Sequence, residues 1–296
     1  MEGLTVLSYG GGQDSTAILL KIINSESFRK QFVSGRFIIV MANTGNEHLH
    51  TYKYVARIRL LCKKKGIPFF MLKMNEYASE SWSGGLIQFY KDKKAVGSKA
   101  FPKTCTDNLK IRPIYKFLES YIHTEFKTEK FGRKSAFYEF TKKYGKIRVL
   151  IGIAKGEEKR ASENGSSNMK WFNECIDKQY PLIEVGMDRK ACQEYIASTE
   201  MEVPFPSNCI LCPFMSLQEL LYLHRFEKYW FDQWVEIEAR KIQNNLHKGE
   251  KNLGVWGSRK LLPEILKEAE AKFGDMSNDD LIEYKMSHGH CVMSKY

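Results

Sequence analysis

Residues 9–16 read Tyr9-Gly10-Gly11-Gly12-Gln13-Asp14-Ser15-Thr16, and this stretch decides the fold. The apolar run Leu4–Leu7 precedes it and Ala17–Leu20 follows it, so a strand, a glycine turn and a helix start follow one another directly. Glycines let backbone N–H groups approach an anion, and the N-terminus of a helix adds partial positive charge. The stretch therefore predicts a phosphate-binding loop between a first strand and a first helix.

Two common kinds of phosphate loop are excluded. The stretch has no Gly-Lys-Ser/Thr ending as in a Walker A loop, and it has no GxGxxG pattern. Asp14 cannot hold a phosphate directly because both are negative, but an Mg²⁺ ion between them would reconcile the charges. The alternative is a strand–turn–helix corner in which the glycines only turn the chain.

Composition points to a folded protein with a polyanionic partner. The 296 residues are 43% hydrophobic and carry a net charge of +11. No apolar run approaches the roughly 20 residues of a membrane span, and the chain enters its first strand without a charged-then-apolar leader. We expect a soluble, cytoplasmic protein without membrane association. The basic charge favours nucleic acid, although a small phosphorylated substrate or solubility alone would also account for it.

Strand-like and helical segments alternate along the first two thirds of the chain. Helical spacing of apolar residues appears in His48–Lys65 and in a later segment with Ile114, Phe117, Leu118, Tyr121 and Ile122 on one face. The further predicted strands are Phe37–Met41, Pro68–Leu72, Arg148–Gly152 and, more weakly, Tyr180–Glu184. This alternation predicts an α/β fold: a mostly parallel, twisted sheet with helices on both faces and ligands at the carboxyl ends of the strands.

The strand pattern ends near residue 200. We expect a nucleotide-binding α/β domain over residues 1–200 and a helical C-terminal region over 201–296. The C-terminal helices are expected at Met215–Asn244, Ser258–Phe273 and Ser277–Ser287. Two glycine-bearing segments, 77–103 and 155–170, are expected to be lids or substrate loops, with plain disorder as the alternative.

Four further segments follow the glycine loop in a fixed order. Met41-Ala42-Asn43-Thr44-Gly45-Asn46-Glu47 is a strand end with a glycine turn, placed where an adenine or a ribose could be contacted. The second segment is Lys103–Pro113, which contains Cys105-Thr106 and Leu109-Lys110-Ile111. The third is Gly152–Arg160. The fourth, which follows a short Tyr180-Pro181-Leu182 match, is Asn208-Cys209-Ile210-Leu211-Cys212-Pro213-Phe214. Together they resemble the phosphoadenosine-phosphosulfate (PAPS) reductase-like branch of the PP-loop ATP pyrophosphatase superfamily. The likeness spans residues 5 to about 215 and is nearest to sulfur-transfer, DNA phosphorothioation-type and uncharacterised phage-type members. The phage-type members imply that this protein could itself be encoded by a phage.

This resemblance implies an adenine nucleotide alpha hydrolase-like fold and a reaction. Enzymes of this superfamily cut ATP between the α- and β-phosphates and leave AMP on an acceptor. The resemblance implies that Asp14, Lys110 and Arg160 are catalytic, the last two on the α-phosphate and the leaving pyrophosphate. The implied nucleotide contacts are Ser8, Gly10, Gly11, Gly12, Gln13, Asp14, Ser15, Thr16, Asn43, Thr44, Gly45, Gly152 and Lys155.

The chain also departs from the pattern of this branch. Residue 154 is Ala where the pattern has Arg, so Lys155, Lys159 or Arg160 would take over phosphate contacts. The tandem cysteines of adenylylsulfate reductases are missing, and the sequence around Cys291 is only a loose match to the tail of PAPS reductases. Because of these differences, sulfur transfer is the first hypothesis and sulfonucleotide reduction the second. A reductase would use a nucleophilic cysteine such as Cys291 and would not cleave ATP.

Three cysteines form a candidate metal site. Cys209-x-x-Cys212 can chelate one ion or one edge of a cluster, and Cys105 is the natural distant third ligand. Three thiolates suit a [4Fe–4S] cluster with one open iron, or a Zn²⁺ completed by a further residue such as Cys291, His288 or His290. The resemblance to PP-loop thiolases implies that the open iron carries sulfide. An incidental or redox-active pair is the alternative, and Cys62, Cys175 and Cys192 are interpreted as core or surface thiols.

A basic segment with aromatic residues bears on the partner. Within residues 126–144, cations alternate with phenylalanines and tyrosines, including Lys130-Phe131. Cations would contact phosphates and exposed aromatics would stack on bases, whereas an amphipathic helix would bury its aromatics. We expect DNA or tRNA as acceptor and a sulfur donor protein such as a cysteine desulfurase; the oligomeric state stays open.

Two further functions remain as alternatives. The chain would also suit an amidating or nitrogen-inserting ligase with a structural zinc, or a nucleotide-binding regulatory subunit of a DNA-modification complex. The absence of HExxH and Gly-x-Ser-x-Gly motifs gives no support to proteolysis or ordinary hydrolase chemistry.

Overall fold

The computed structural model describes residues 3–129 and 132–288. In this part of the chain, five strands form one parallel sheet in the order β3-β2-β1-β4-β5. The strands are β1 (Leu4–Ser8), β2 (Arg36–Asn43), β3 (Phe69–Lys73), β4 (Ile147–Ile151) and β5 (Ile176–Gln179). The predicted parallel α/β sheet is confirmed.

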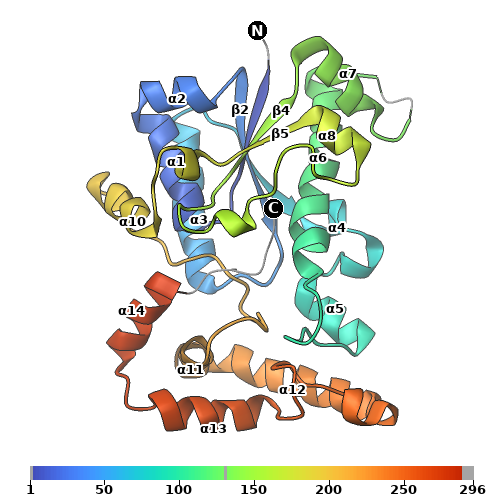
Figure 1. Cartoon of the computed structure of the whole chain (residues 1–296), viewed down its shortest axis with the longest axis vertical. Helices are drawn as coiled ribbons and strands as arrows, with labels where there is room; N and C mark the ends of the chain where they lie inside the picture. The colour runs from blue at the N-terminus through green and yellow to red at the C-terminus, as the bar shows by residue number, and fades with distance from the viewer. Residues whose placement is uncertain (1–2, 130–131, 289–296) are drawn as a thin grey trace.

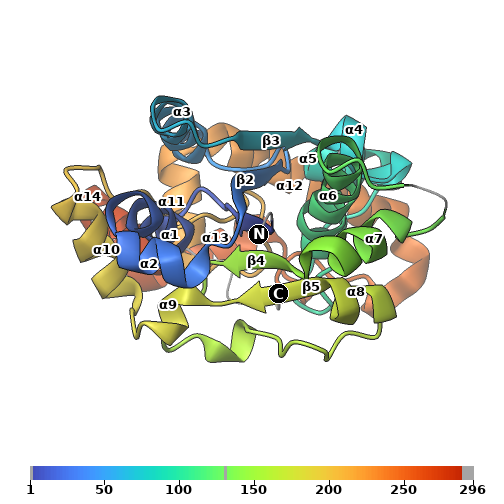
Figure 2. The same cartoon turned by 90° about the horizontal axis from the view of Figure 1, so that it is seen from above.

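Helices cover both faces of the sheet (Figure 2). One face carries α1 (Gln13–Asn24), α2 (Glu26–Phe32), α3 (Leu49–Lys64) and α10 (Arg189–Ser198). On the other side lie α4 (Met74–Tyr77), α5 (Gly85–Lys93), α6 (Arg112–Glu125), α7 (Ser135–Tyr144) and α8 (Lys170–Cys175). Successive side chains of a strand point to opposite faces of the sheet. Leu7 therefore packs in the apolar core on one face and Val6 in the core on the other.

The C-terminal helices pack at the end of the molecule opposite α2 and α7 (Figure 1). They are α11 (Leu217–Phe226), α12 (Lys228–Asn244), α13 (Leu262–Phe273) and α14 (Asn278–His288). Leu220 and Trp234 belong to the same apolar cluster as Val6 of β1, so these helices share a core with the sheet. The division of the chain at residue 200 stays a prediction.

Short helical segments complete the description. They are the 3₁₀ turns η1 (Glu80–Trp82), η3 (Glu158–Arg160) and η4 (Leu246–Lys251), the π-helical η2 (Asp107–Ile111), and α9 (Pro181–Glu184). The predicted loop 77–103 therefore contains η1 and α5, whereas most of 155–170 is irregular as expected. Of the described helices, none is long and apolar enough to cross a membrane.

Two predicted elements are wrong. The segment Met215–Asn244 is two helices, because Glu227 leaves the helical conformation (φ −136°, ψ 44°) and its side chain contacts His48. The weak fifth strand at Tyr180–Glu184 is the helix α9, and the strand lies just before it as β5. Pro181 explains this error, since proline lacks a ladder N–H and suits the first turn of a helix.

The basic segment packs as an amphipathic helix and its flanks. Phe126, Phe137 and Phe140 are buried and form ring contacts with other core aromatics. These three rings cannot stack on bases, so that part of the nucleic-acid hypothesis is wrong. Lys130-Phe131 lies outside the described residues.

Candidate functional site

The glycine loop lies at the switch point of the sheet. Strand β1 pairs with β2 on one side and with β4 on the other, and Ser8 of β1 is in register with Ile151 of β4. The chain thus leaves these two central strands toward opposite edges, which opens a crevice at their carboxyl ends. A cavity of about 400 Å³ lies there, lined by Ser8, by the glycine loop and by Gly152.

Close backbone approaches explain the glycines of the loop. A Cβ on Gly12 would lie 2.7 Å from the backbone nitrogen of Ser207, and one on Gly152 would lie 2.7 Å from that of Ser15. Gly11 has a φ of +80°, which glycine adopts without strain. The Ser15 hydroxyl accepts a hydrogen bond from the Gly10 N–H at 3.2 Å. The loop is therefore fixed between β4 and the segment around Ser207, with α1 beginning at its end.

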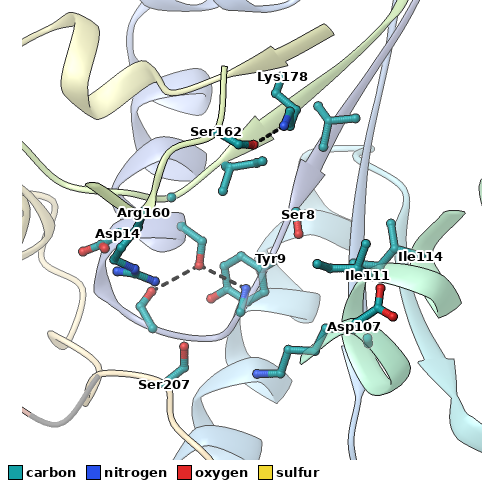
Figure 3. Close-up of a pocket in the computed structure, with 18 of the residues that line it drawn as sticks. Ser8, Tyr9, Asp14, Asp107, Ile111, Ile114, Arg160, Ser162, Lys178 and Ser207 are labelled. Atoms are coloured by element: carbon teal, nitrogen blue, oxygen red, sulfur yellow. Dashed lines mark hydrogen bonds between the residues drawn. The ribbon is translucent and has the colours of Figure 1, made fainter. Parts of the chain in front are cut away.

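Charged side chains surround one end of the cavity (Figure 3). Asp14 Oδ2 lies 3.8 Å from Nη2 of Arg189, which also binds Glu157 at 2.5 Å, and Arg160 pairs with the other oxygen of Glu157. Burial raises the pKa of Asp14, an effect that the cation of Arg189 opposes. Asp14 Oδ1 is buried and has no hydrogen-bond partner among the described residues. Such an oxygen suits an Mg²⁺ ion held between Asp14 and phosphates.

The opposite wall of the cavity is apolar. Its side chains come from η2, α6, β4 and α8 and include Ile111, Ile114, Val149, Ile151 and Phe172. Lys178 of β5 also lines the cavity, where it binds Ser162; burial lowers the pKa of this ammonium group. A cavity with a charged end at a glycine loop and an apolar far wall fits a nucleotide, with phosphates at the loop and the base against the wall.

The predicted nucleotide residues divide into two groups. Those that line the cavity are Ser8, Gly10, Gly12, Gln13, Asp14, Ser15, Lys110, Gly152 and Arg160. The described cavity lining does not include Gly11, Thr16, Asn43, Thr44, Gly45 or Lys155. Thr16 is instead bonded to the buried Tyr9 hydroxyl at 2.9 Å, and the Asn43 carboxamide accepts from Tyr52 at 2.8 Å.

Several lining residues were not predicted. Arg189, Lys178, Ser162 and Ser207 lie far along the sequence from the glycine loop and are in no motif. The side chain of Gln13, a predicted contact, donates to the carbonyls of Pro204 and Met286 at 2.9 and 3.0 Å. Gln13 therefore ties the start of α1 to α14.

A second cavity, of about 190 Å³, brings the three predicted cysteines together. Cys105, Cys209 and Cys212 all line it, as does Thr44 from the turn after β2. The turn pairs with the cysteine segment through a bridge between Glu47 and Cys209 and through the Ile210 N–H on the Asn46 carbonyl at 2.8 Å. This pairing places the Cys209-x-x-Cys212 segment beside the carboxyl ends of the strands.

Lys110 lies at the boundary between the two cavities. It lines both of them, and its Nζ lies 3.2 Å from Oε1 of the buried Glu47. Thr44 donates to the same Glu47 oxygen at 3.0 Å. The ion pair with Glu47 thus holds the ammonium group of Lys110 between the nucleotide cavity and the cysteines.

The chemistry of the cysteines fits a metal centre. Burial raises the pKa of the Cys209 thiol, so a thiolate there requires a bound cation. Three thiols on one small cavity are a donor set for a [4Fe–4S] cluster or for Zn²⁺. Of the proposed additional ligands, His288 is exposed on α14, and His290 and Cys291 lie outside the described residues. The remaining described thiols, Cys62, Cys175 and Cys192, are buried in the two cores.

A buried ion pair supports the cysteine segment. Lys285 of α14 is 1% exposed, and its Nζ lies 3.1 Å from Glu219 Oε1 and 2.9 Å from Asn208 Oδ1. Asn208 precedes Cys209, and Met286, next to Lys285, accepts the hydrogen bond from Gln13. Helix α14 therefore holds the cysteine segment and the start of the glycine-loop helix at once.

Comparisons with known proteins give weak structural likenesses and no match in sequence. No protein-family model matches the sequence, and no curated protein matches it either. The fold is similar to the U34-tRNA thiolase NcsA from Methanococcus maripaludis with its [4Fe–4S] cluster, at 13% identity over 93% of this chain and 74% of that chain. The TM-score is 0.39, a value at which the likeness does not indicate function.

Proposed function

We propose that this protein is a PP-loop ATP pyrophosphatase that adenylates a nucleic-acid acceptor and then replaces the adenylate by sulfur. The observation that carries the proposal is the position of Lys110, which lines both the nucleotide cavity and the cavity of the three cysteines. A reaction in two halves requires two adjoining sites, one that activates the acceptor and one that delivers the nucleophile.

In the activation half, the triphosphate of ATP lies along the glycine loop. Backbone N–H groups and the N-terminus of α1 contact the phosphates, and Asp14 would hold an Mg²⁺ ion that neutralises them. An acceptor oxygen attacks the α-phosphorus, the bond to the bridging oxygen breaks, and pyrophosphate leaves. Lys110, Arg160 and Arg189 are placed to stabilise the charge that develops on the phosphates.

In the sulfur half, Cys105, Cys209 and Cys212 would hold an iron–sulfur cluster, which supplies the sulfur when it is bound. Lys110 lies where AMP departs, so its ammonium group can neutralise the leaving phosphate. The apolar side chains around the cysteines exclude water, which would otherwise hydrolyse the adenylate.

The acceptor is proposed to be a nucleic acid for two reasons, the positive net charge of the protein and the aromatic side chains at the cysteine cavity. The net charge is +11, and Phe101, which lines that cavity, is 55% exposed and so lies where the cavity meets solvent. Phe214 lines the same cavity, with Lys103 Nζ 5.8 Å from its ring centre. The exposed ring of Phe101 suits stacking on an unpaired base, and the cation at the Phe214 ring suits a neighbouring phosphate.

The proposal is tested with anaerobically purified protein. We expect pyrophosphate release from ATP with tRNA or DNA, and a sulfur-containing nucleoside by mass spectrometry after addition of a sulfide source. Phe101→Ala should weaken acceptor binding by about tenfold, as loss of one stacking contact predicts. Tyr229→Ala, an exposed aromatic on α12, is the matched control and should behave as wild type. Absence of pyrophosphate release with every nucleic acid tried would refute the proposal.

A further inference from the structure

A second cluster of metal-ligating side chains lies outside both cavities. His48 caps the N-terminus of α3, His50 lies in its first turn, and Glu227 separates α11 from α12. Each offers one ligand atom, and among the described residues these three atoms all lie within 4.8 Å of one another. Neither the nucleotide cavity nor the cysteine cavity includes any of them.

The three side chains of this cluster are already packed against one another. His48 Nδ1 lies 2.6 Å from Glu227 Oε1, and the two imidazole rings are nearly parallel, 9° apart with centres 4.9 Å apart. His48 is 1% exposed, and Phe205 packs against the ring of His50 at 4.4 Å. Nε2 of each histidine is buried without a hydrogen-bond partner in the described part of the chain.

We propose that His48, His50 and Glu227 bind a divalent transition-metal cation such as Zn²⁺. Two imidazole nitrogens and one carboxylate oxygen are a donor set that Zn²⁺ takes in proteins, and they leave a fourth position for water. Nε2 of each ring has no hydrogen-bond partner among the described residues, so each histidine keeps a ring nitrogen that a cation can bind.

The charges around the cluster bear on its occupancy. Glu47 and Glu227 place negative charge toward His48, whereas Lys285 places positive charge there. Lys285 is itself paired with Glu219, which offsets its repulsion of a cation. Two helix N-termini, of α3 and α12, also oppose a cation, so the carboxylate of Glu227 is the ligand on which binding depends most.

The cation would act as a structural tie. It would join the start of α3 to the break between α11 and α12, which lie close together in Figure 1. His48 follows Glu47, the residue that bridges Cys209 and pairs with Lys110.

The test is a titration of the full chain with Co²⁺ and Zn²⁺ after treatment with a chelator. We expect wild type to bind one more Co²⁺ than His50→Gln does, with a d–d absorption that is free of thiolate charge transfer and therefore distinct from cobalt on the cysteines. Zn²⁺ should raise the melting temperature of wild type more than that of His50→Gln, which keeps only the cysteines as a zinc site.

Two further variants complete the test. His247→Gln, an exposed histidine in η4, is the matched control and should retain the additional Co²⁺. Glu227→Gln can still accept a hydrogen bond from His48, so it serves if His50→Gln does not fold, and its affinity should fall at least about 100-fold. Equal Co²⁺ stoichiometry and affinity in wild type, His50→Gln and Glu227→Gln would overturn the proposal. Failure of pyrophosphate release would not affect it, because the readout is metal binding.

Discussion

The nucleotide cavity and the cysteine cavity adjoin at Lys110, yet they are built in different ways. The phosphate end of the nucleotide cavity depends on one local signature, a strand, a glycine loop and a helix start, whose backbone groups would contact phosphates. The cysteine cavity joins Thr44, Cys105 and Cys209, which are far apart in the sequence and meet only through tertiary contacts. The phosphate end of one site is therefore set by a short segment, whereas the other site depends on tertiary contacts throughout, and the two should fail independently.

The largest expected effect separates the two cavities directly. In Cys209→Ser we expect sulfur insertion to be lost, because the donor set loses a thiolate, while pyrophosphate release stays within about twofold of wild type, since Cys209 lies outside the nucleotide cavity. Thionucleoside yield and pyrophosphate release are measured on the same samples. Cys192→Ser, a buried thiol in the other core, is the control and should retain insertion. Equal loss of both activities in Cys209→Ser would show that the cavities are not separable.

Asp14→Asn should produce the opposite pattern. Loss of the carboxylate removes the proposed Mg²⁺ ligand, so pyrophosphate release should fall about 1,000-fold, within the range for losing one group that stabilises transition-state charge. The cysteines are untouched, and the visible absorption of the cluster should be unchanged. Asp275→Asn, an exposed carboxylate, is the matched control. Unchanged pyrophosphate release in Asp14→Asn would contradict the assigned role of this residue.

A smaller effect is expected where the two cavities share a support. Lys285→Met leaves Glu219 buried without its cation and should lower the free energy of unfolding by about 3 kcal/mol. The double variant Lys285→Met/Glu219→Gln removes both charges and should recover most of this loss. Chemical denaturation measures both values. A single variant as stable as wild type would show that α14 does not hold the cysteine segment.

The same contrast explains what the sequence could predict. The glycine loop, the parallel sheet and the pair Cys209 and Cys212 were predicted because each has a local signal: glycines between apolar runs, alternation of strands and helices, or Cys-x-x-Cys spacing. Cys105 was added as a distant third ligand because it lies in a segment of the family resemblance. Arg189 and Lys178 were missed because a lone cation on a helix or a strand looks the same whether it faces solvent or a cavity. Asn43 and Lys155 were predicted from their place in a motif, but neither lines the cavity, since a motif fixes the backbone path and not each side chain.

The break at Glu227 was missed for a related reason. No glycine or proline marks it, and the apolar spacing continues across it. The capping box of Ser216 and Glu219 starts α11, and the contact between Glu227 and His48, distant in sequence, accompanies its end. Such tertiary contacts override local helix propensity and leave no local signal.

The smallest expected effect concerns how the free energy of unfolding depends on pH. Wild type and Asp14→Asn should differ in this dependence, and the difference should change when Mg²⁺ and a nucleotide bind. Burial raises the pKa of Asp14 above its ordinary value of 3.8, so the folded state binds this proton more tightly than the unfolded state does. Stability then falls as the pH rises from about 4 through the raised pKa, by about 1.4 kcal/mol for each pKa unit of the shift. Asp14→Asn lacks this loss, so without ligands it should match wild type at low pH and exceed it at neutral pH in chemical denaturation. Mg²⁺ with a non-hydrolysable ATP analogue should reverse the order, because the cation then stabilises the carboxylate in wild type alone. If the two proteins keep the same difference in stability at every pH, with and without ligand, then Asp14 is neither destabilised by its burial nor a ligand of the cation.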